Sequence, residues 1–170
     1  MDLPADLLKK IPVGAHIPIL NQIKAGYLNN ENMRSLLEKK YGKEVIDQLV
    51  KDVKQAQTER VVRTELERYK LPTDLLKTVP VDSQEKVLSA IKSGNLEPQR
   101  ESLEKALGKD GYKTFENNFY AAMAAAQPKE LPQDLLRKNV PWKQHGDYMA
   151  KYKTGTVKDR QFILTMIGYY

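Results

Sequence analysis

The sequence predicts an all-α protein made of internal helical repeats, and three observations support this. A motif with the pattern Leu-Pro-x-Asp-Leu-Leu occurs three times, beginning at Leu3, Leu71 and Leu131. Each copy is followed by a proline, by a Lys-small-Gly triplet, and by an arginine with a glycine eight positions later. No run of alternating β-branched residues bounded by hairpin turns is present in the sequence, so strands are not expected. Recurrence of this density is typical of stacked helical units, which usually serve binding rather than catalysis.

The spacing of the motif defines the expected units. The second copy begins 68 residues after the first, and the third begins 60 residues after the second. We therefore expect two complete units, residues 1–70 and 71–130, and a third, partial unit, residues 131–170. The pattern is compatible with a solenoid or with a compact helical bundle, and with a complete chain or a piece of a longer array.

Each Leu-Pro-x-Asp-Leu-Leu motif is expected to start a short helix. Proline has the fixed φ that suits the first helical position, and the aspartate two residues later favours the positive end of the helix dipole. The two leucines supply an apolar anchor, and the next proline, Pro80 in the second copy, ends the helix. The recurring proline and aspartate positions are Pro4 and Asp6, Pro72 and Asp74, and Pro132 and Asp134.

A second helix is expected from Asp82 to Gly94 in the middle unit. Asp82 and Glu85 have the spacing of a capping box, and Gly94 is the expected C-terminal glycine. The apolar stripe is Val87, Leu88 and Ile91, and its counterparts are Ile19, Leu20 and Ile23 before Gly26, and Tyr148, Met149 and Tyr152 before Gly155. Cations that suit the negative end of the dipole precede these glycines, at Lys24, Lys92 and Lys153.

A third helix is expected to carry the repeated arginine and to end at a glycine. Each copy has an arginine, an apolar residue three positions later and a glycine eight positions later. These residues are Arg34, Leu37 and Gly42 in the first copy; Arg100, Leu103 and Gly108 in the second; and Arg160, Ile163 and Gly168 in the third. Further helices are expected at residues 43–69 and 110–127. Their apolar positions are Val45, Ile46, Leu49, Val50, Val53, Val61, Val62 and Leu66 in the first, and Tyr112, Phe115, Phe119 and Met123 in the second. The alanine-rich run 121–126 would let another helix approach closely.

Composition excludes several kinds of chemistry. The chain has no cysteine, which rules out disulfides, thiolate metal sites and a cysteine nucleophile. Its two histidines, His16 and His145, are far apart in sequence, and zinc sites usually gather three or four ligands. No stretch approaches 18 consecutive apolar residues, and the first residues lack the basic and apolar regions of a signal peptide. We expect a soluble, cytoplasmic protein with no membrane partner, no metal and no cofactor.

Patterns that suggest enzymes do not fit their context. Ser83 and Lys86 have Ser-x-x-Lys spacing and Lys153-Thr154-Gly155 reads Lys-Thr-Gly, but in acyl-transfer enzymes that triplet lies on a strand, and here it ends a helix. Gly42-Lys43 and Gly108-Lys109 lack the remainder of a phosphate-binding loop. We therefore expect no enzymatic activity.

The charge of the chain suggests where an anionic partner would bind. The net charge is +6, and residues 131–170 contribute +4 of it, with seven basic and three acidic side chains. The candidate anion or nucleic-acid contacts are Arg34, Arg100, Lys138, Lys143, Lys151, Lys153, Lys158 and Arg160. The alternative for the three arginines is that each pairs with a neighbouring acid or with backbone carbonyls.

Aromatic residues are interleaved with the basic residues of the third unit: Trp142, Tyr148, Tyr152 and Phe162. Exposed aromatics beside cations hold single-stranded nucleic acids by stacking and phosphate attraction. However, Tyr148 and Tyr152 align with expected core positions, and Trp142 aligns with Val13 and Val81, so most of these aromatics are expected in the core. The leading hypothesis is a non-catalytic helical-repeat module or scaffold that binds another protein; nucleic-acid binding by the basic third unit is the alternative.

Overall fold

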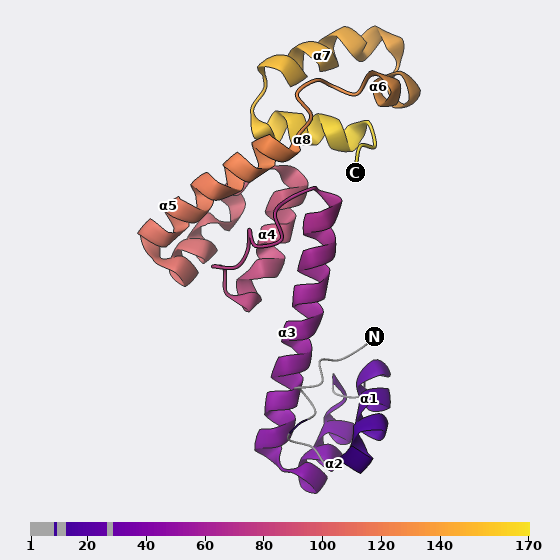
Figure 1. Ribbon diagram of the computed structural model, residues 1–170, viewed down its shortest axis with the longest axis vertical. Helices are drawn as coiled ribbons and strands as arrows, with labels where there is room; N and C mark the ends of the chain where they lie inside the picture. Colours follow the sequence, from indigo (N-terminus) through magenta and orange to yellow (C-terminus); the bar gives the residue numbers. More distant parts are fainter. Residues whose placement is uncertain (1–8, 10–12, 27–28) are drawn as a thin grey trace. The chain divides into compact units, whose positions relative to one another are not determined.

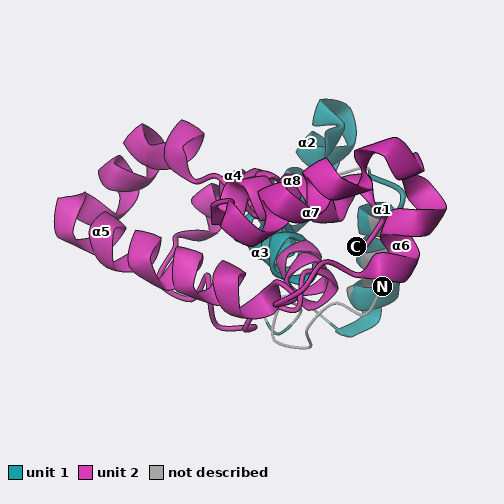
Figure 2. Cartoon of the chain, turned by 90° about the horizontal axis from the view of Figure 1, so that it is seen from above, with its two compact units in different colours: residues 1–60 teal, residues 61–170 magenta. Residues whose placement is uncertain are grey.

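The computed structural model describes residues 9, 13–26 and 29–170, apart from the side chains of Ala15, Leu20 and Lys24. Within these ranges all regular secondary structure is helical, which confirms the all-α prediction (Figure 1). The chain divides into two compact units, Met1–Arg60 and Val61–Tyr170 (Figure 2). No helix in the described ranges combines the length and apolar character needed to span a membrane. The division into three repeats stays a prediction.

The first unit contains α1 (His16–Lys24), α2 (Glu31–Tyr41) and the beginning of α3 (Lys43–Arg68), with the short 3₁₀ turn η2 (Val13–Ala15) before α1. Asn30 caps α2, because its side chain accepts hydrogen bonds from the amides of Asn32 and Met33. Gly26 and Gly42 follow α1 and α2 with positive φ, as expected of helix-ending glycines. The core of this unit is formed by Ile19, Ile23, Leu37, Ile46, Leu49 and Val53. The predicted positions Pro4 and Asp6 and the side chain of Leu20 lie outside what the structure describes.

The second unit contains the end of α3 and all later helices. These are α4 (Val81–Ser93), η4 (Glu97–Gln99), α5 (Arg100–Ala126), α6 (Gln133–Asn139), η5 (Trp142–Gln144), α7 (His145–Thr154) and α8 (Val157–Met166). One buried cluster is centred on α3, α4 and α5, and includes Leu66, Val87, Ile91, Leu103, Phe115 and Phe119. A second cluster, with Leu136, Tyr152, Ile163, Leu164 and Ile167, joins α6, α7 and α8.

The second Leu-Pro-x-Asp-Leu-Leu motif does not form the predicted helix. Residues 73–78 form consecutive turns, and the amides of Leu75, Lys77 and Val79 donate to carbonyls three residues back. The segment must bury Leu71, Leu76 and Val79 within a few residues, so packing overrides the local helix signal. In the third copy the motif does form α6, with Pro132 at the N-cap and Asp134 in the first turn. The anchor role of the second leucine holds in both copies, since Leu76 and Leu136 are buried.

Helix α4 starts earlier than predicted and ends where predicted. It begins at Val81 with Pro80 as N-cap, so Asp82 lies in the first turn of the helix and not at the N-cap position. Its stripe Val87, Leu88 and Ile91 is buried, as expected from the helical spacing. Gly94 then takes a left-handed conformation with φ of 66°. The amides of Gly94 and Asn95 donate to the carbonyls of Ile91 and Ala90, which is the hydrogen-bond pattern of a Schellman motif.

One expectation about the long helices needs correction and another is confirmed. Val61 is 51% exposed on α3, because its neighbour Val62 occupies the buried position at that turn. The predicted helix end at Gly108 is confirmed, because the backbone of α5 breaks there into two helical stretches, with φ of 75° and ψ of 164° at the glycine. Beyond the break Tyr112, Phe115, Phe119 and Met123 are buried as predicted, and Ala122 and Ala126 pack against the same cluster.

Gly94 is required both by its backbone conformation and by a close approach of α8. A Cβ at Gly94 would lie 2.7 Å from the Cβ of Gln161 and 3.1 Å from the Cα of Lys158. Gly146, on α7, has no atom within 4 Å of the position a Cβ would take. The two glycines therefore form a matched pair for substitution.

We expect Gly94→Ala to lower the free energy of unfolding by about 1–3 kcal/mol, because it adds left-handed strain and a clash. Gly146→Ala, inside a helix, should be neutral or stabilising by about 0.5–1 kcal/mol. Urea denaturation of both variants measures the difference. Equal stability of the two variants would contradict the close contact between α4 and α8.

Candidate binding groove

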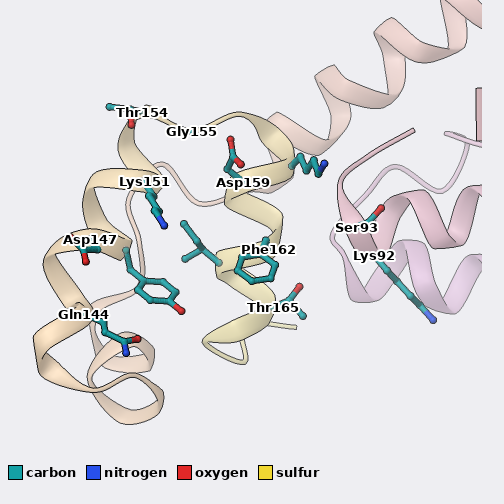
Figure 3. Close-up of a pocket in the computed structure, with 13 residues that line it drawn as sticks. Lys92, Ser93, Gln144, Asp147, Lys151, Thr154, Gly155, Asp159, Phe162 and Thr165 are labelled. Atoms are coloured by element: carbon teal, nitrogen blue, oxygen red, sulfur yellow. The ribbon is translucent and has the colours of Figure 1, made fainter. Parts of the chain in front are cut away.

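A groove of about 1030 Å³ lies on the second unit between α7 and α8 and reaches the C-terminal end of α4 (Figure 3). Helix α7 contributes residues at helical spacing, and α8 contributes a similar stripe, so each helix presents one face to the groove. The lining side chains that matter below are Tyr148 and Lys151 from α7, Lys158, Asp159 and Phe162 from α8, and Lys92 from α4. Lys151 extends from α7 into the space between the two helices (Figure 3).

The groove has an aromatic part. Phe162 is 61% exposed, and Tyr148 is half-buried against the cluster of α6, α7 and α8. Tyr152 fulfils its predicted core role: it is buried, its hydroxyl donates to the Pro128 carbonyl, and burial raises its pKa. Met149 was expected in the same core stripe, but it is 41% exposed because it lies one residue beyond the buried face of α7.

Lysines line the groove on three sides. Lys151 comes from α7, Lys158 from α8 and Lys92 from the last turn of α4. In the part of the chain that the structure describes, neither Lys151 nor Lys158 makes a salt bridge or hydrogen bond. Lys92 lies 3.8 Å from a carboxylate oxygen of Glu65, the outer limit of an ion pair. The ammonium groups of Lys151 and Lys158 are therefore available to a bound anion, whereas that of Lys92 is shared with Glu65.

Of the two carboxylates in the groove, Asp159 is already used by the chain. One of its oxygens accepts hydrogen bonds from the amide and the hydroxyl of Thr156, at 2.8 and 2.7 Å, and completes the capping box of α8. These hydrogen bonds favour the charged form and lower the pKa of Asp159; the nearby charges of Lys158 and Lys151 act in the same direction. The other carboxylate, Asp147, lies in the first turn of α7.

The turn between the two helices depends on Gly155. Gly155 follows the last residue of α7, as expected of a helix-ending glycine, but its backbone is extended, with φ of −76° and ψ of 163°. Glycine is required here by space: a Cβ would lie 2.4 Å from the Lys151 carbonyl oxygen and 2.8 Å from the Asp159 Cβ. Gly168, the predicted helix end after α8, has a positive φ of 72°.

A buried glutamine holds the α4 end of the groove in place. Gln161 is fully buried, and its amide nitrogen donates to the Ile91 carbonyl at 3.2 Å. Its amide oxygen accepts from Gln127 at 3.2 Å and from the Tyr170 hydroxyl at 3.1 Å. Nothing in the sequence pattern distinguishes Gln161 from a solvent-exposed helical glutamine, so it was missed.

The three repeated arginines are occupied by contacts inside their own units. Arg34 pairs with Glu38 and Asp47, and Arg100 pairs with Glu104 at 3.0 Å. The Arg160 Nε donates to the Tyr152 carbonyl at 3.0 Å, near the end of α7. This geometry matches the alternative of pairing with acids or carbonyls; contact with an external anion stays a prediction.

The remaining basic candidates are dispersed around the third unit. Lys138 is on α6, Lys143 is on η5 and Lys153 is on α7; all three are exposed, and none of them lines the groove. Only Lys151 and Lys158 among the predicted contacts are brought together there. The groove itself was not predicted, because the sequence pattern does not give the packing of α7 on α8.

Trp142 and Phe162 correct the expectation that most aromatics of this segment are in the core. Trp142 is 76% exposed. Its alignment with Val13 was misleading because Val13 is itself 82% exposed, so that position is not a core position. Phe162 lies on the outer face of α8, since the inner face is filled by Ile163, Leu164 and Ile167.

Comparison of the chain with protein-family models, with curated proteins and with solved structures finds no significant match. Among the described residues, no group of three or more histidine, aspartate or glutamate side chains is placed to hold a metal ion. The function proposed below therefore depends on the geometry of the groove.

Removal of the Thr156 hydroxyl should raise the pKa of Asp159 toward its ordinary value. A carboxylate with a lowered folded-state pKa adds stability above its unfolded pKa, and this stability is lost as the pH falls through the folded pKa. Thr156→Ala should therefore make the loss of stability in acid smaller. NMR titration of the carboxyl carbon, with Thr154→Ala as control, measures the shift; an unchanged pKa in Thr156→Ala would contradict the assigned hydrogen bonds.

Proposed function

We propose that this chain is a non-catalytic helical module that binds a segment of a partner protein in the groove between α7 and α8. The observation that carries the proposal is the exposed ring of Phe162, which lines the same groove as Tyr148 and two lysines without salt bridges. Single exposed apolar residues are ordinary, but an aromatic group set in a concave surface and rimmed by polar residues is typical of an interaction site.

The energetics of such a groove suit a protein ligand. A Phe or Tyr ring that becomes fully buried on binding contributes a large apolar area with few rotatable bonds, and such residues often dominate the binding energy. Helical walls also keep the site close to its bound shape, which lowers the entropic cost of binding. Polar rim residues then select the partner through charge.

Nucleic-acid binding is a second candidate, and the exposed Trp142 favours it. The Lys143 ammonium lies 6.0 Å from the centroid of the Trp142 ring. An exposed indole beside a cation can stack on an unpaired base while the cation meets a phosphate. Further lysines of the same segment would add to this attraction, namely Lys138, Lys151, Lys153 and Lys158.

The protein-binding proposal is tested by selecting phage-displayed random peptides on the immobilised full chain. Peptides that bind the groove should lose at least about tenfold in affinity for Phe162→Ala, as expected for a central aromatic contact. Val61→Ala, which truncates an exposed apolar residue outside the groove, is the matched control and should bind like the parent. Failure to enrich any peptide, or equal binding to Phe162→Ala, would refute the proposal.

The nucleic-acid alternative predicts a steep dependence on salt. Binding of a fluorescent single-stranded oligonucleotide should be measurable at about 50 mM salt and largely lost at about 200 mM, because counterions are released on binding. Trp142→Ala should weaken it further, by the loss of one stacking platform. A duplex oligonucleotide serves as the comparison. No binding at the lower salt concentration would exclude this alternative.

A further inference from the structure

We infer that the segment bound in the groove is an acidic one, which places a carboxylate at the Lys151 and Lys158 end and a bulky apolar side chain on Tyr148 and Phe162. This inference rests on the proposed function, and it adds the chemistry and the orientation of the partner.

The turn between α7 and α8 fixes where two lysines lie along the groove. Helices α7 and α8 are joined at Gly155 and Thr156, so residues near this connection lie at the same end of the groove. Lys151 is four residues before Gly155, and Lys158 is three residues after it. Both lysines are therefore attached at the end of the groove next to the turn, which we call the basic end.

The aromatic residues of the groove lie farther from the turn than these two lysines. Tyr148 lies seven residues before Gly155, and Phe162 lies seven residues after it. On each helix the ring is thus about one helical turn, roughly 5 Å, farther from the connection than the lysine. On both α7 and α8 the lysine is nearer the turn than the aromatic ring, while the third lysine of the groove, Lys92, comes from α4.

The basic end of the groove has an unfavourable arrangement of charge. Lys158 is the second residue of α8, where the positive end of the helix dipole disfavours a cation. Asp159 is the nearest carboxylate, and it is held in the capping box by Thr156. An incoming carboxylate would therefore relieve an unfavourable charge arrangement as well as pair with two free ammonium groups.

The opposite end of the groove carries a carboxylate. Asp147 lies eight residues before Gly155, beyond Tyr148, whereas Lys151 and Lys158 are nearer the turn. The third lining lysine, Lys92, comes from α4 and lies 3.8 Å from a carboxylate oxygen of Glu65. A carboxylate placed beside Asp147 would be repelled. The charges consequently favour one direction of the bound segment. Its acidic residue lies near the turn, and its apolar residue lies farther from the turn, on Tyr148 and Phe162.

The test uses two synthetic peptides with the same apolar residues, one with glutamates before the apolar anchor and one with lysines in the same positions. Binding to the full chain is measured by fluorescence anisotropy. The acidic peptide should bind at least about tenfold more tightly than the basic one, and the preference should weaken as salt is raised, as expected for exposed charges.

Charge reversal locates the effect. The double variant Lys151→Glu and Lys158→Glu should weaken the acidic peptide by about tenfold and strengthen the basic peptide. Lys153→Glu is the matched control, because Lys153 lies in the same last turn of α7 as Lys151 but does not line the groove. It should change the affinity by less than about twofold. Thermal unfolding monitored by circular dichroism verifies that all variants remain folded.

The outcomes separate the inference from the proposed function. If peptides bind the parent chain but not Phe162→Ala, and the acidic peptide binds no more tightly than the basic one, the inference alone is overturned. An equal loss in Lys153→Glu would also overturn it, because the attraction would then be a property of the whole basic surface. Absence of binding by any peptide would overturn both. An oligonucleotide that displaces the acidic peptide and depends on the same two lysines would assign the groove to nucleic acid instead.

Discussion

One buried side chain, Gln161, connects the helices of the second unit. The Ile91 carbonyl in the last turn of α4 accepts from the Gly94 amide and also from the side-chain amide of Gln161 on α8. Ile91 and Gln161 are 70 positions apart in sequence. The contact is possible because Gly94 has no Cβ in the space occupied by the Gln161 side chain. In a low-dielectric interior these groups would be costly to leave unpaired, so α8 and the end of α4 are held together.

The same glutamine links the two apolar clusters of this unit. Its amide oxygen accepts from Gln127, whose side chain also donates to the Val157 carbonyl at the start of α8. It further accepts from the hydroxyl of Tyr170, which is packed against both clusters and lies 4.5 Å from Tyr69, ring centroid to ring centroid. Burial raises the pKa of Tyr170 and keeps it a neutral donor. A short polar layer thus fixes the position of α8, and with it one wall of the groove.

The sequence alone predicted the helix ends and the buried apolar faces of helices that depend only on neighbouring residues. Gly94 and Gly168 were identified because a left-handed helix end strongly favours glycine, and Val87 and Ile91 were identified by helical spacing. The turns at residues 73–78 were not predicted, because burial of Leu76 and Val79 decided the backbone there. Gln161 was missed for the same kind of reason, since its partners lie on other elements.

The exposure of Phe162 follows from how α8 is already used. Gln161 faces α4 and α5, while Ile163, Leu164 and Ile167 fill the cluster shared with α6 and α7. These four positions occupy the buried sides of the helix, and the remaining side carries Lys158, Phe162 and Thr165 at helical spacing. Phe162 is not among the residues that form either buried cluster, and 61% of it is exposed. The proposed ligand would gain the free energy of burying this exposed part of the ring.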